Sequence, residues 1–315
     1  MKDGRNLVLS IGRLYCDLVF RGLEALPRLG EERFAKEVSV VPGGGGFITA
    51  AHLASLGERA ALLARIGTDP LSEVIAPALQ QSGVDLRWLE RAPDAGPQPT
   101  VVMVQAGERA FLSRRAGKAR PTTLEAALAD AEARHLHIAE FATLAESPEL
   151  VSLAKLAGLT VSLDPSWDDA LIHDPDLVLR STGTDIFLPN AAEARAIAGC
   201  EDLDQAGRRL ARHFPVVVIK DGAAGAKLFQ REQSLNLPAP QGGPVLDTTG
   251  AGDAFNAGFI AAWIAGHPPS QALAEGIACG TLSVQGVGGA GVRLARGRVA
   301  DISKTLLEEH GRIDA

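Results

Sequence analysis

The sequence predicts an α/β fold: a doubly wound, mostly parallel sheet with helices on both faces, together with a small β-sheet lid. Apolar runs of strand length alternate with stretches of helical periodicity along most of the chain, and this alternation is typical of parallel sheets joined by crossover helices. Glycine is abundant, at 34 of 315 residues, and aromatic residues make up only 4%. Small residues on helices packed against a sheet give this balance, whereas a disordered chain would not.

The elements of the main sheet follow one another in a regular order. Strands are expected at residues 7–11, 60–66, 135–139, 160–163, 186–188 and 216–219. Helices are expected at residues 47–55, 71–79, 150–157 and 206–213, and at 255–263 before a stop signal at 266–269. Because no repeat or long linker interrupts this order, we expect one domain that spans residues 1–315.

Two segments depart from the alternation. Residues 14–41 and 100–115 contain short alternating runs that no helix follows, for example Val101, Met103 and Phe111. They predict a small extra sheet that stands off the main one as a lid over a site. Two separate surface hairpins are the alternative that the local pattern leaves open.

Charge and composition limit the expected partners and compartment. The formal net charge is −7, and a surface of this sign repels phosphate backbones, so no nucleic-acid partner is expected. The three cysteines lie far apart and have neither metal nor redox spacing. The apolar run at residues 7–11 is only strand-sized, which predicts a cytoplasmic protein with neither a signal peptide nor a membrane span.

The most informative stretch is DTTGAGDAFNAG at residues 247–258, which leads into the helix that bears Phe255. Gly250 and Gly252 have no side chain to block a ligand, so the backbone N–H groups of residues 250–253 can point at an anion. A carboxylate is useful here if Asp253 removes a proton from a substrate hydroxyl while the amides stabilise a transferring phosphoryl group. Taken alone, Gly-x-Gly-Asp fits a helix N-cap better, and the twelve-residue context favours catalysis.

The run at residues 247–255 resembles the C-terminal signature of the ribokinase-like carbohydrate kinases, the phosphofructokinase B family. The resemblance continues in order through most of the chain, in the glycine motif at residues 43–57 and in Ile-Gly-Thr-Asp at residues 66–69. It implies ATP-dependent phosphorylation of a hydroxyl group, with Asp253 as the catalytic base. The residues that it places at the anion hole are Gly250, Ala251 and Gly252, and those that it places against the acceptor are Asp17, Gly43, Gly44 and Gly45.

The resemblance also implies a site for ATP and Mg²⁺. Asn190 and Glu193 match an Asn-x-x-Glu element that organises Mg²⁺ and phosphate through water, whereas the residues alone favour a solvated first-turn glutamate. The nucleotide contacts that it implies are Asn190, Glu193, Lys220, Gly222, Gly225 and, in the segment 278–289 beside the adenine, Gly288. Asp247 and Thr249 resemble the residues that hold an activating K⁺ in some members.

Two departures from the family pattern concern the acceptor. Ile48 stands where the family has an asparagine that contacts substrate, and an isoleucine cannot hydrogen-bond a sugar hydroxyl. After the mid-chain Asp164-Pro165, kinases of carboxylated sugars carry Asn and Arg, but this chain has the acidic pair Asp168-Asp169. A carboxylated sugar is therefore not expected, and the acceptor stays open.

The sequence leaves three functions open. The first is a carbohydrate kinase, the second is a nucleoside kinase in which Phe47 or Ile48 contacts the base, and the third is a non-catalytic ligand-binding protein of the same fold. A dinucleotide oxidoreductase and a P-loop NTPase are not expected, because the sequence has neither of their glycine motifs. A homodimer through the lid is expected by analogy with the family.

Overall fold

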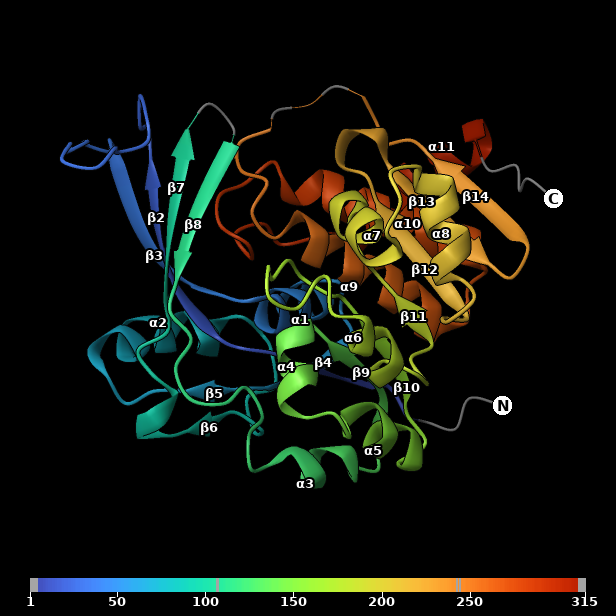
Figure 1. Ribbon diagram of the computed structural model, residues 1–315, viewed down its shortest axis with the longest axis horizontal. Helices are drawn as coiled ribbons and strands as arrows, with labels where there is room; N and C mark the ends of the chain where they lie inside the picture. Colours follow the sequence, from blue (N-terminus) through green and yellow to red (C-terminus); the bar gives the residue numbers. More distant parts are fainter. Residues whose placement is uncertain (1–4, 106–107, 242, 244, 311–315) are drawn as a thin grey trace.

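The computed structural model describes residues 5–105, 108–241, 243 and 245–310. Figure 1 shows a large sheet flanked by helices and a smaller sheet that projects from it at the upper left. The two ends of the predicted domain, residues 1–4 and 311–315, lie outside the described residues, as do residues 106–107 in the second predicted lid segment.

The main sheet has the strand order β14-β13-β12-β11-β10-β9-β1-β4. Its strands are β1 (Leu7–Ile11), β4 (Arg59–Leu63), β9 (Ala133–Ile138), β10 (Thr160–Leu163), β11 (Ile186–Phe187), β12 (Val216–Lys220), β13 (Ala226–Gln230) and β14 (Gln233–Leu237). The pairs from β12 to β4 are parallel, and β13 and β14 add an antiparallel hairpin at one edge. The predicted, mostly parallel sheet is thus confirmed.

Helices cover both faces of this sheet because its strands are apolar on both sides. One face packs against α1 (Gly45–Ser55), α2 (Pro70–Gln81), α9 (Ala251–Ala265), α10 (Pro269–Ser283) and α11 (Arg296–His310). The other packs against α3 (Leu124–Leu128), α4 (Phe141–Glu146), α5 (Leu150–Leu156), α6 (Pro175–Arg180), α7 (Ala191–Ala198) and α8 (Leu203–Leu210). In β1, Val8 belongs to the first core, and Leu7 and Leu9 belong to the second, as expected for a strand buried on both faces.

The second sheet, called the small sheet below, joins the two segments that the sequence sets apart. Its strand order is β3-β2-β7-β8. The strands are β2 (Tyr15–Arg21), β3 (Glu37–Gly43), β7 (Pro99–Gln105) and β8 (Glu108–Ser113). Because β2 pairs in parallel with β7, the two segments form one sheet, and the alternative of two separate hairpins is wrong.

Several predicted element boundaries need correction. The strand expected at residues 60–66 ends at Leu63, and β5 (Arg65–Ile66) instead pairs with β6 (Glu90–Arg91) in a separate two-stranded sheet. Ion pairs from Arg65 to Glu90 and Asp94 draw this segment away from the main sheet. The first helix begins at Gly45, inside the glycine run, and the helix expected at 206–213 begins earlier, at Leu203, because Asp202 caps it. Short turns of 3₁₀-helix occur at Pro93–Ala95 and Gly222–Ala224.

The topology brings distant segments to one edge of the main sheet. From β1 the chain moves to β4 on one side, and it later returns to β9 on the other side. The ends of parallel strands on either side of such a reversal border a crevice in which α/β proteins bind ligands. Residues 12–17, 139–140, 164, 190 and 220 follow or end these strands, so their side chains are candidates for the site.

Candidate active site

The motif at residues 247–258 forms a tight turn that opens α9. Gly250 caps the helix with φ of 72°, a left-handed conformation that favours glycine. Its α-carbon also packs so closely on Gly289 that a β-carbon would stand 2.7 Å from the Gly289 backbone. The N–H of Ala251 donates to the Thr248 carbonyl. The N–H groups of Gly252 and Asp253 lie in the first turn, where a helix offers no acceptor of its own.

The Asp253 carboxylate faces the first residue of α1, Gly45. A β-carbon on Gly45 would stand 2.9 Å from Asp253 Oδ1, so the missing side chain leaves the carboxylate room. Burial, followed by the negative charge of Asp164, raises the pKa of Asp253 to about 7, and the positive charge of Lys220 opposes this shift. At this value the carboxyl group can change protonation state near neutral pH.

Asp17 approaches the same space from β2 of the small sheet. Its carboxyl group lies against Gly43, at which a β-carbon would stand 2.0 Å from Asp17 Oδ2. Burial raises the pKa of Asp17 to about 7, and its charge contributes to the raised pKa of Asp253. Gly44 follows as the N-cap of α1. The predicted acceptor residues thus lie together and beside Asp253.

A polar cluster links the predicted Lys220 to two residues that sequence reasoning did not assign to the site, Asp164 and Asn256. Asp164, at the end of β10, accepts from Lys220 Nζ at 2.5 Å and from Asn256 Nδ2 at 2.6 Å. Lys220 Nζ also donates to Asn256 Oδ1 at 3.2 Å. A β-carbon on Gly252 would be 3.5 Å from Lys220 Nζ, so the ammonium group lies beside the first turn of α9. The position of Asp164 directly after a parallel strand was the signal that could have found it.

Asn190 and Glu193 begin α7 with reciprocal backbone contacts. Asn190 Oδ1 accepts from the Glu193 N–H at 2.9 Å, and Glu193 Oε2 accepts from the Asn190 N–H at 2.8 Å, which is a capping box. Burial and the nearby charge of Asp164 raise the pKa of Glu193 to about 7. Its helix-capping role is therefore shown, and its charge is coupled to the cluster around Asp164.

The remaining predicted nucleotide residues lie in two loops. Gly222 and Gly225 form the turn between β12 and β13, directly after Lys220, and Gly225 approaches the Leu237 carbonyl closely. Gly288 lies in the loop between α10 and α11, where its N–H donates to Asp247 Oδ2 at 2.9 Å.

The side chains of Asp247 and Thr249 bond to each other. Asp247 Oδ1 accepts from both the N–H (2.8 Å) and the hydroxyl (2.6 Å) of Thr249. Arg109, on β8 of the small sheet, donates to the Thr249 hydroxyl at 3.1 Å. Burial opposes ionisation of Asp247, but these hydrogen bonds, that from Gly288 and the charge of Arg109 together lower its pKa. Arg109 was not predicted, because nothing local in β8 sets it apart.

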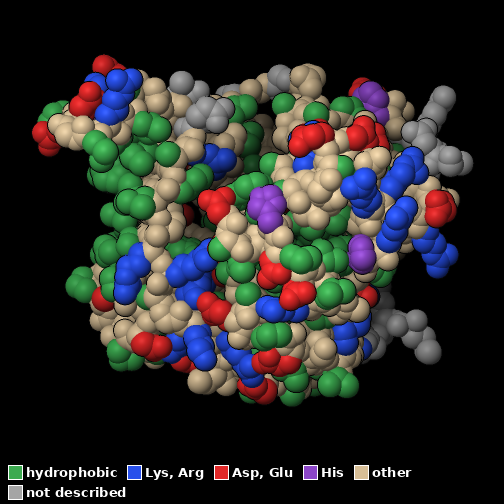
Figure 2. Space-filling view, viewed as in Figure 1, with side chains coloured by type: hydrophobic (Ala, Val, Ile, Leu, Met, Phe, Trp, Pro, Cys, Tyr) green, Lys and Arg blue, Asp and Glu red, His purple; other side chains and the backbone are tan. Residues whose placement is uncertain are grey.

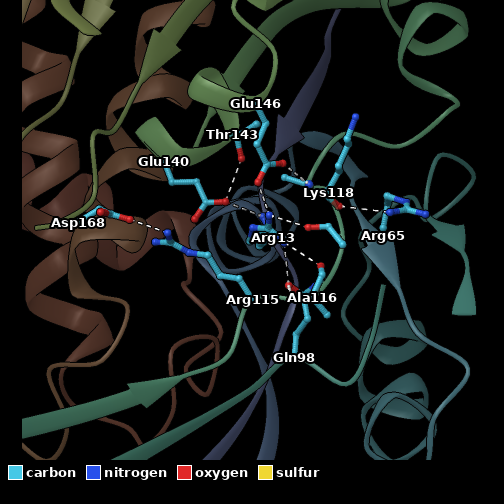
Figure 3. A network of polar contacts seen from close by, with 12 residues as sticks. Arg13, Arg65, Gln98, Arg115, Ala116, Lys118, Glu140, Thr143, Glu146 and Asp168 are labelled. Atoms are coloured by element: carbon cyan, nitrogen blue, oxygen red, sulfur yellow. Dashed lines mark hydrogen bonds and ion pairs between the residues drawn. The ribbon is translucent and has the colours of Figure 1, made fainter. Parts of the chain in front are cut away.

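Figure 3 shows a second network at the base of the small sheet, with Arg13 at its centre. The buried Arg13 guanidinium donates to Gln98 Oε1 and the Ala116 carbonyl, which flank β7 and β8, and forms an ion pair with Glu146 on α4. The Arg13 N–H donates to Glu140 Oε1 at 3.1 Å. Glu140 follows β9 and has a pKa raised by burial, so it is a further acid near the acceptor side.

The arrangement combines an ionisable carboxylate at a helix N-terminus with cationic and acidic side chains around it. It can accept a proton from an alcohol and hold an anionic group at the same place. The comparison with known proteins decides between a kinase and other anion sites. Residues 5–293 match the protein family described as "pfkB family carbohydrate kinase". The chain belongs to this family.

Its relatives include sugar kinases that match most of the pfkB kinase described here. A ribokinase of Arabidopsis thaliana is 30% identical, with 85% of this chain and 73% of the relative covered. A fructokinase of Klebsiella pneumoniae is 31% identical, with coverages of 78% and 87%. The structure of Arabidopsis thaliana ribokinase with ribose and ATP superposes with a TM-score of 0.80 at 25% identity, covering 96% of this chain and 99% of that one. The predicted family, fold and enzyme class are thus confirmed.

Ile48 occupies the sequence position of the family asparagine in this pfkB kinase, but its side chain does not take over the contact with the acceptor. Its side chain is 4% exposed and lies against Gly289, where a β-carbon would stand 2.4 Å from Ile48 Cδ1. One turn later, His52 Nε2 contacts the Gly289 carbonyl at 2.8 Å. Ile48 and His52 therefore hold the Gly288–Gly289 loop, and the acceptor must be recognised by other side chains.

Proposed function

We propose that this kinase transfers the γ-phosphoryl group of ATP to a hydroxyl of a sugar or sugar-like acceptor, with Asp253 as general base. The acceptor hydroxyl gives its proton to Asp253, and its oxygen forms the new bond to the γ-phosphorus. The bond from that phosphorus to the β,γ-bridging oxygen breaks, and ADP leaves with that oxygen. The amides of Gly252 and Asp253 would stabilise charge on the transferring group. The observation that carries this proposal is the Asp253 carboxylate beside Gly45, with its pKa raised to about 7.

The acceptor would lie between the small sheet and α9. Asp17 and Glu140 are acceptors for sugar hydroxyls, and Gly43, Gly44 and Gly45 allow the acceptor to approach the backbone. A nucleoside acceptor was expected to contact Phe47 or Ile48. Both side chains are buried, and Ile48 packs on Gly289, so these residues support a sugar more than a nucleoside.

We assign the nucleotide and Mg²⁺ to the strand ends on the other side of Asp253. Lys220 would neutralise phosphate charge. Gly222 and Gly225 lie in the turn that follows it, and Gly288 lies in the loop between α10 and α11. Among residues 5–105, 108–241, 243 and 245–310, no group of three or more His, Cys, Asp or Glu is placed to hold a metal. Asp164, Asn190 and Glu193 fit a Mg²⁺ ion that is bound chiefly by phosphate and water, and Mg²⁺ would screen the charge of the phosphates.

The expected K⁺ fits Asp247 and Thr249 less well. Asp247 Oδ1 already accepts two hydrogen bonds, and the Thr249 hydroxyl lies 3.1 Å from a guanidinium nitrogen. A cation at these side chains would be repelled by Arg109. The proposed reaction therefore has no step that depends on K⁺.

The small sheet is assigned two roles in this proposal. Arg13 ties both of its entry segments to the main domain, so the sheet can act as a hinged lid. Its outer face is apolar, with Val38, Val40 and Leu112 at 59%, 38% and 69% exposure. Figure 2 shows hydrophobic side chains gathered in the region of the small sheet. A second copy of the chain would cover this face in a homodimer.

A kinase that consumes ATP is expected in the cytoplasm, where ATP is made and used. No helix within the described part of the chain is both long enough and apolar enough to cross a membrane.

The experiment that tests the function is a coupled ADP-release assay with MgATP. The panel contains aldoses, ketoses, sugar acids and nucleosides. One strong neutral-sugar acceptor supports the proposal, and a strong nucleoside acceptor replaces it with the nucleoside kinase. ATP binding without phosphorylation of any acceptor would favour a non-catalytic binding protein.

A further inference from the structure

The inner face of the small sheet carries a row of side chains that ends in Arg109. Strand alternation puts Arg109 on the same side of β8 as Phe111 and Ser113. Ser113 Oγ contacts Thr100 Oγ1 at 2.9 Å, and Thr100 is the register partner of Asp17 on β2. Arg109 therefore lies on the same face as Asp17, at the opposite end of β8 from the strand's base.

Arg109 connects this face to the motif loop. Its Nη1 donates to Thr249 Oγ1 at 3.1 Å, a contact between residues 140 positions apart in sequence. Its guanidinium carbon also lies 5.5 Å from the ring centroid of Phe111, and this contact orients the guanidinium. Thr249 is the residue directly before Gly250, so the contact reaches the start of the anion hole.

The same contact gives the loop a positive charge. Asp247 is the acid of the loop, and its three donors come from Thr249 and Gly288. Its charge is offset by Arg109 through the shared Thr249 hydroxyl, which donates to Asp247 and accepts from Arg109. A monovalent cation at these side chains would have to displace the donors or lie beside a like charge. The side chains therefore fit Arg109 better than K⁺.

We propose that Arg109 is a positioning residue that supplies the positive charge of the motif loop in place of a monovalent cation. The small sheet thereby holds Asp247 and Thr249, and through them the turn at Gly250 that begins the anion hole. A guanidinium suits this role because it is permanently charged and donates several hydrogen bonds in one plane. The proposal rests on the proposed phosphoryl transfer at α9 and adds that this transfer is independent of K⁺.

The test compares the full-length wild-type protein with Arg109→Ala and Arg109→Lys. Arg33→Ala is the matched control, because Arg33 is also an arginine of the small-sheet segments and pairs with Glu31, two residues away. kcat and KM for MgATP are measured in KCl and in choline chloride at equal ionic strength. We expect the wild-type kcat to be the same in both salts within about twofold, and Arg109→Ala to lose about 10- to 100-fold in kcat. KCl should restore part of this loss, and Arg109→Lys should retain more activity than Arg109→Ala.

A binding readout separates this inference from the proposed function. In a thermal-shift measurement, K⁺ should raise the Tm of Arg109→Ala and leave that of the wild type and Arg33→Ala unchanged, relative to choline. If no acceptor is phosphorylated, the proposed function has failed and this shift still tests Arg109. Activation of the wild type by K⁺ of more than about fivefold, or a wild-type kcat in Arg109→Ala, would overturn the inference.

Discussion

The Asp253 carboxylate lies against the α-carbon of Gly45, where a β-carbon would stand 2.9 Å from Asp253 Oδ1. The two residues are 208 positions apart in sequence, and each belongs to the first turn of its helix. The pair joins the acceptor side of the site to the helix that begins the anion hole. A side chain added at Gly45 would therefore move the Asp253 carboxylate without removing it.

Gly45→Ala should reduce kcat about 10²-fold, because an added methyl group displaces Asp253 and a misplacement of about 1 Å can cost that much. The measurement is steady-state kinetics with the acceptor found in the panel. Gly297→Ala is the matched control, since Gly297 lies in α11 with nothing within 4 Å of an added β-carbon. Equal activities of the two variants would show that the close approach at Gly45 has no functional role.

The acid limb of kcat/KM should lie near pH 7, since Asp253 must be ionised to accept a proton and its pKa is raised to about 7. Activity should therefore fall as pH decreases through this value. Asp17 and Glu193 titrate in the same range, so the limb belongs to the coupled group.

Asp164→Asn should move this acid limb to lower pH by about one unit, because it removes a negative charge that raises the pKa of Asp253 and leaves the opposing charge of Lys220 unpaired. The position of the limb is the readout, since its height also depends on nucleotide binding. Asp169→Asn, an exposed acid in the same loop, should leave the limb in place. A limb that stays put in Asp164→Asn would contradict the assigned cause of the pKa shift.

Asp253→Asn should stabilise the protein at pH 8 by about 1–3 kcal/mol, since one pKa unit corresponds to about 1.4 kcal/mol and the partial exposure of the residue reduces the effect. The folded state binds this proton more tightly than the unfolded chain, so stability falls as pH rises from the ordinary aspartate pKa of about 4 to the raised value of about 7. The gain should shrink towards pH 4 and is measured as Tm across this range. A constant gain at all pH values would mean that charge is not its cause.

Val40→Lys combined with Leu112→Lys should convert a homodimer into a monomer, because two charges would be placed on the apolar outer face of the small sheet. Light scattering coupled to size exclusion measures the mass of the wild type and the double variant. Lys36→Glu, outside this face, keeps a charge at an already charged position and serves as the control. A wild type that is monomeric at all concentrations would refute the dimer.

Much of the fold was predictable because each signal was local. Alternation of apolar runs gave β1, β9, β10 and β12 nearly as the structure has them. The β13–β14 hairpin was missed because it is antiparallel and β13 leads directly into β14 with no helix between them. The small sheet was foreseen as a departure from alternation, but only the β2–β7 pairing makes it one sheet, and such a long-range pairing leaves no local trace.

The candidate site also contains residues that the sequence could identify and residues that it could not. Residues 247–258 form one contiguous motif, so Asp253 and the turn before it could be found from sequence. Asp164 and Arg109 come from a strand end and a separate strand, and they reach Asp253 or its loop only after folding. Glu140 likewise meets Arg13 only after folding. For Glu193 the sequence identifies the residue but cannot separate its two roles, because the predicted Mg²⁺ role and the capping box use the same carboxylate.

The most direct test of the central claim compares Asp253→Asn and Asp253→Ala with the wild type in the ADP-release assay, with ATP affinity measured by calorimetry in parallel. Loss of a general base should lower kcat about 10²- to 10⁴-fold, while the affinity for MgATP stays within about threefold of the wild type. That result would establish Asp253 as the group that activates the acceptor hydroxyl. Near-normal kcat in either variant, with the acceptor still phosphorylated, would contradict the account.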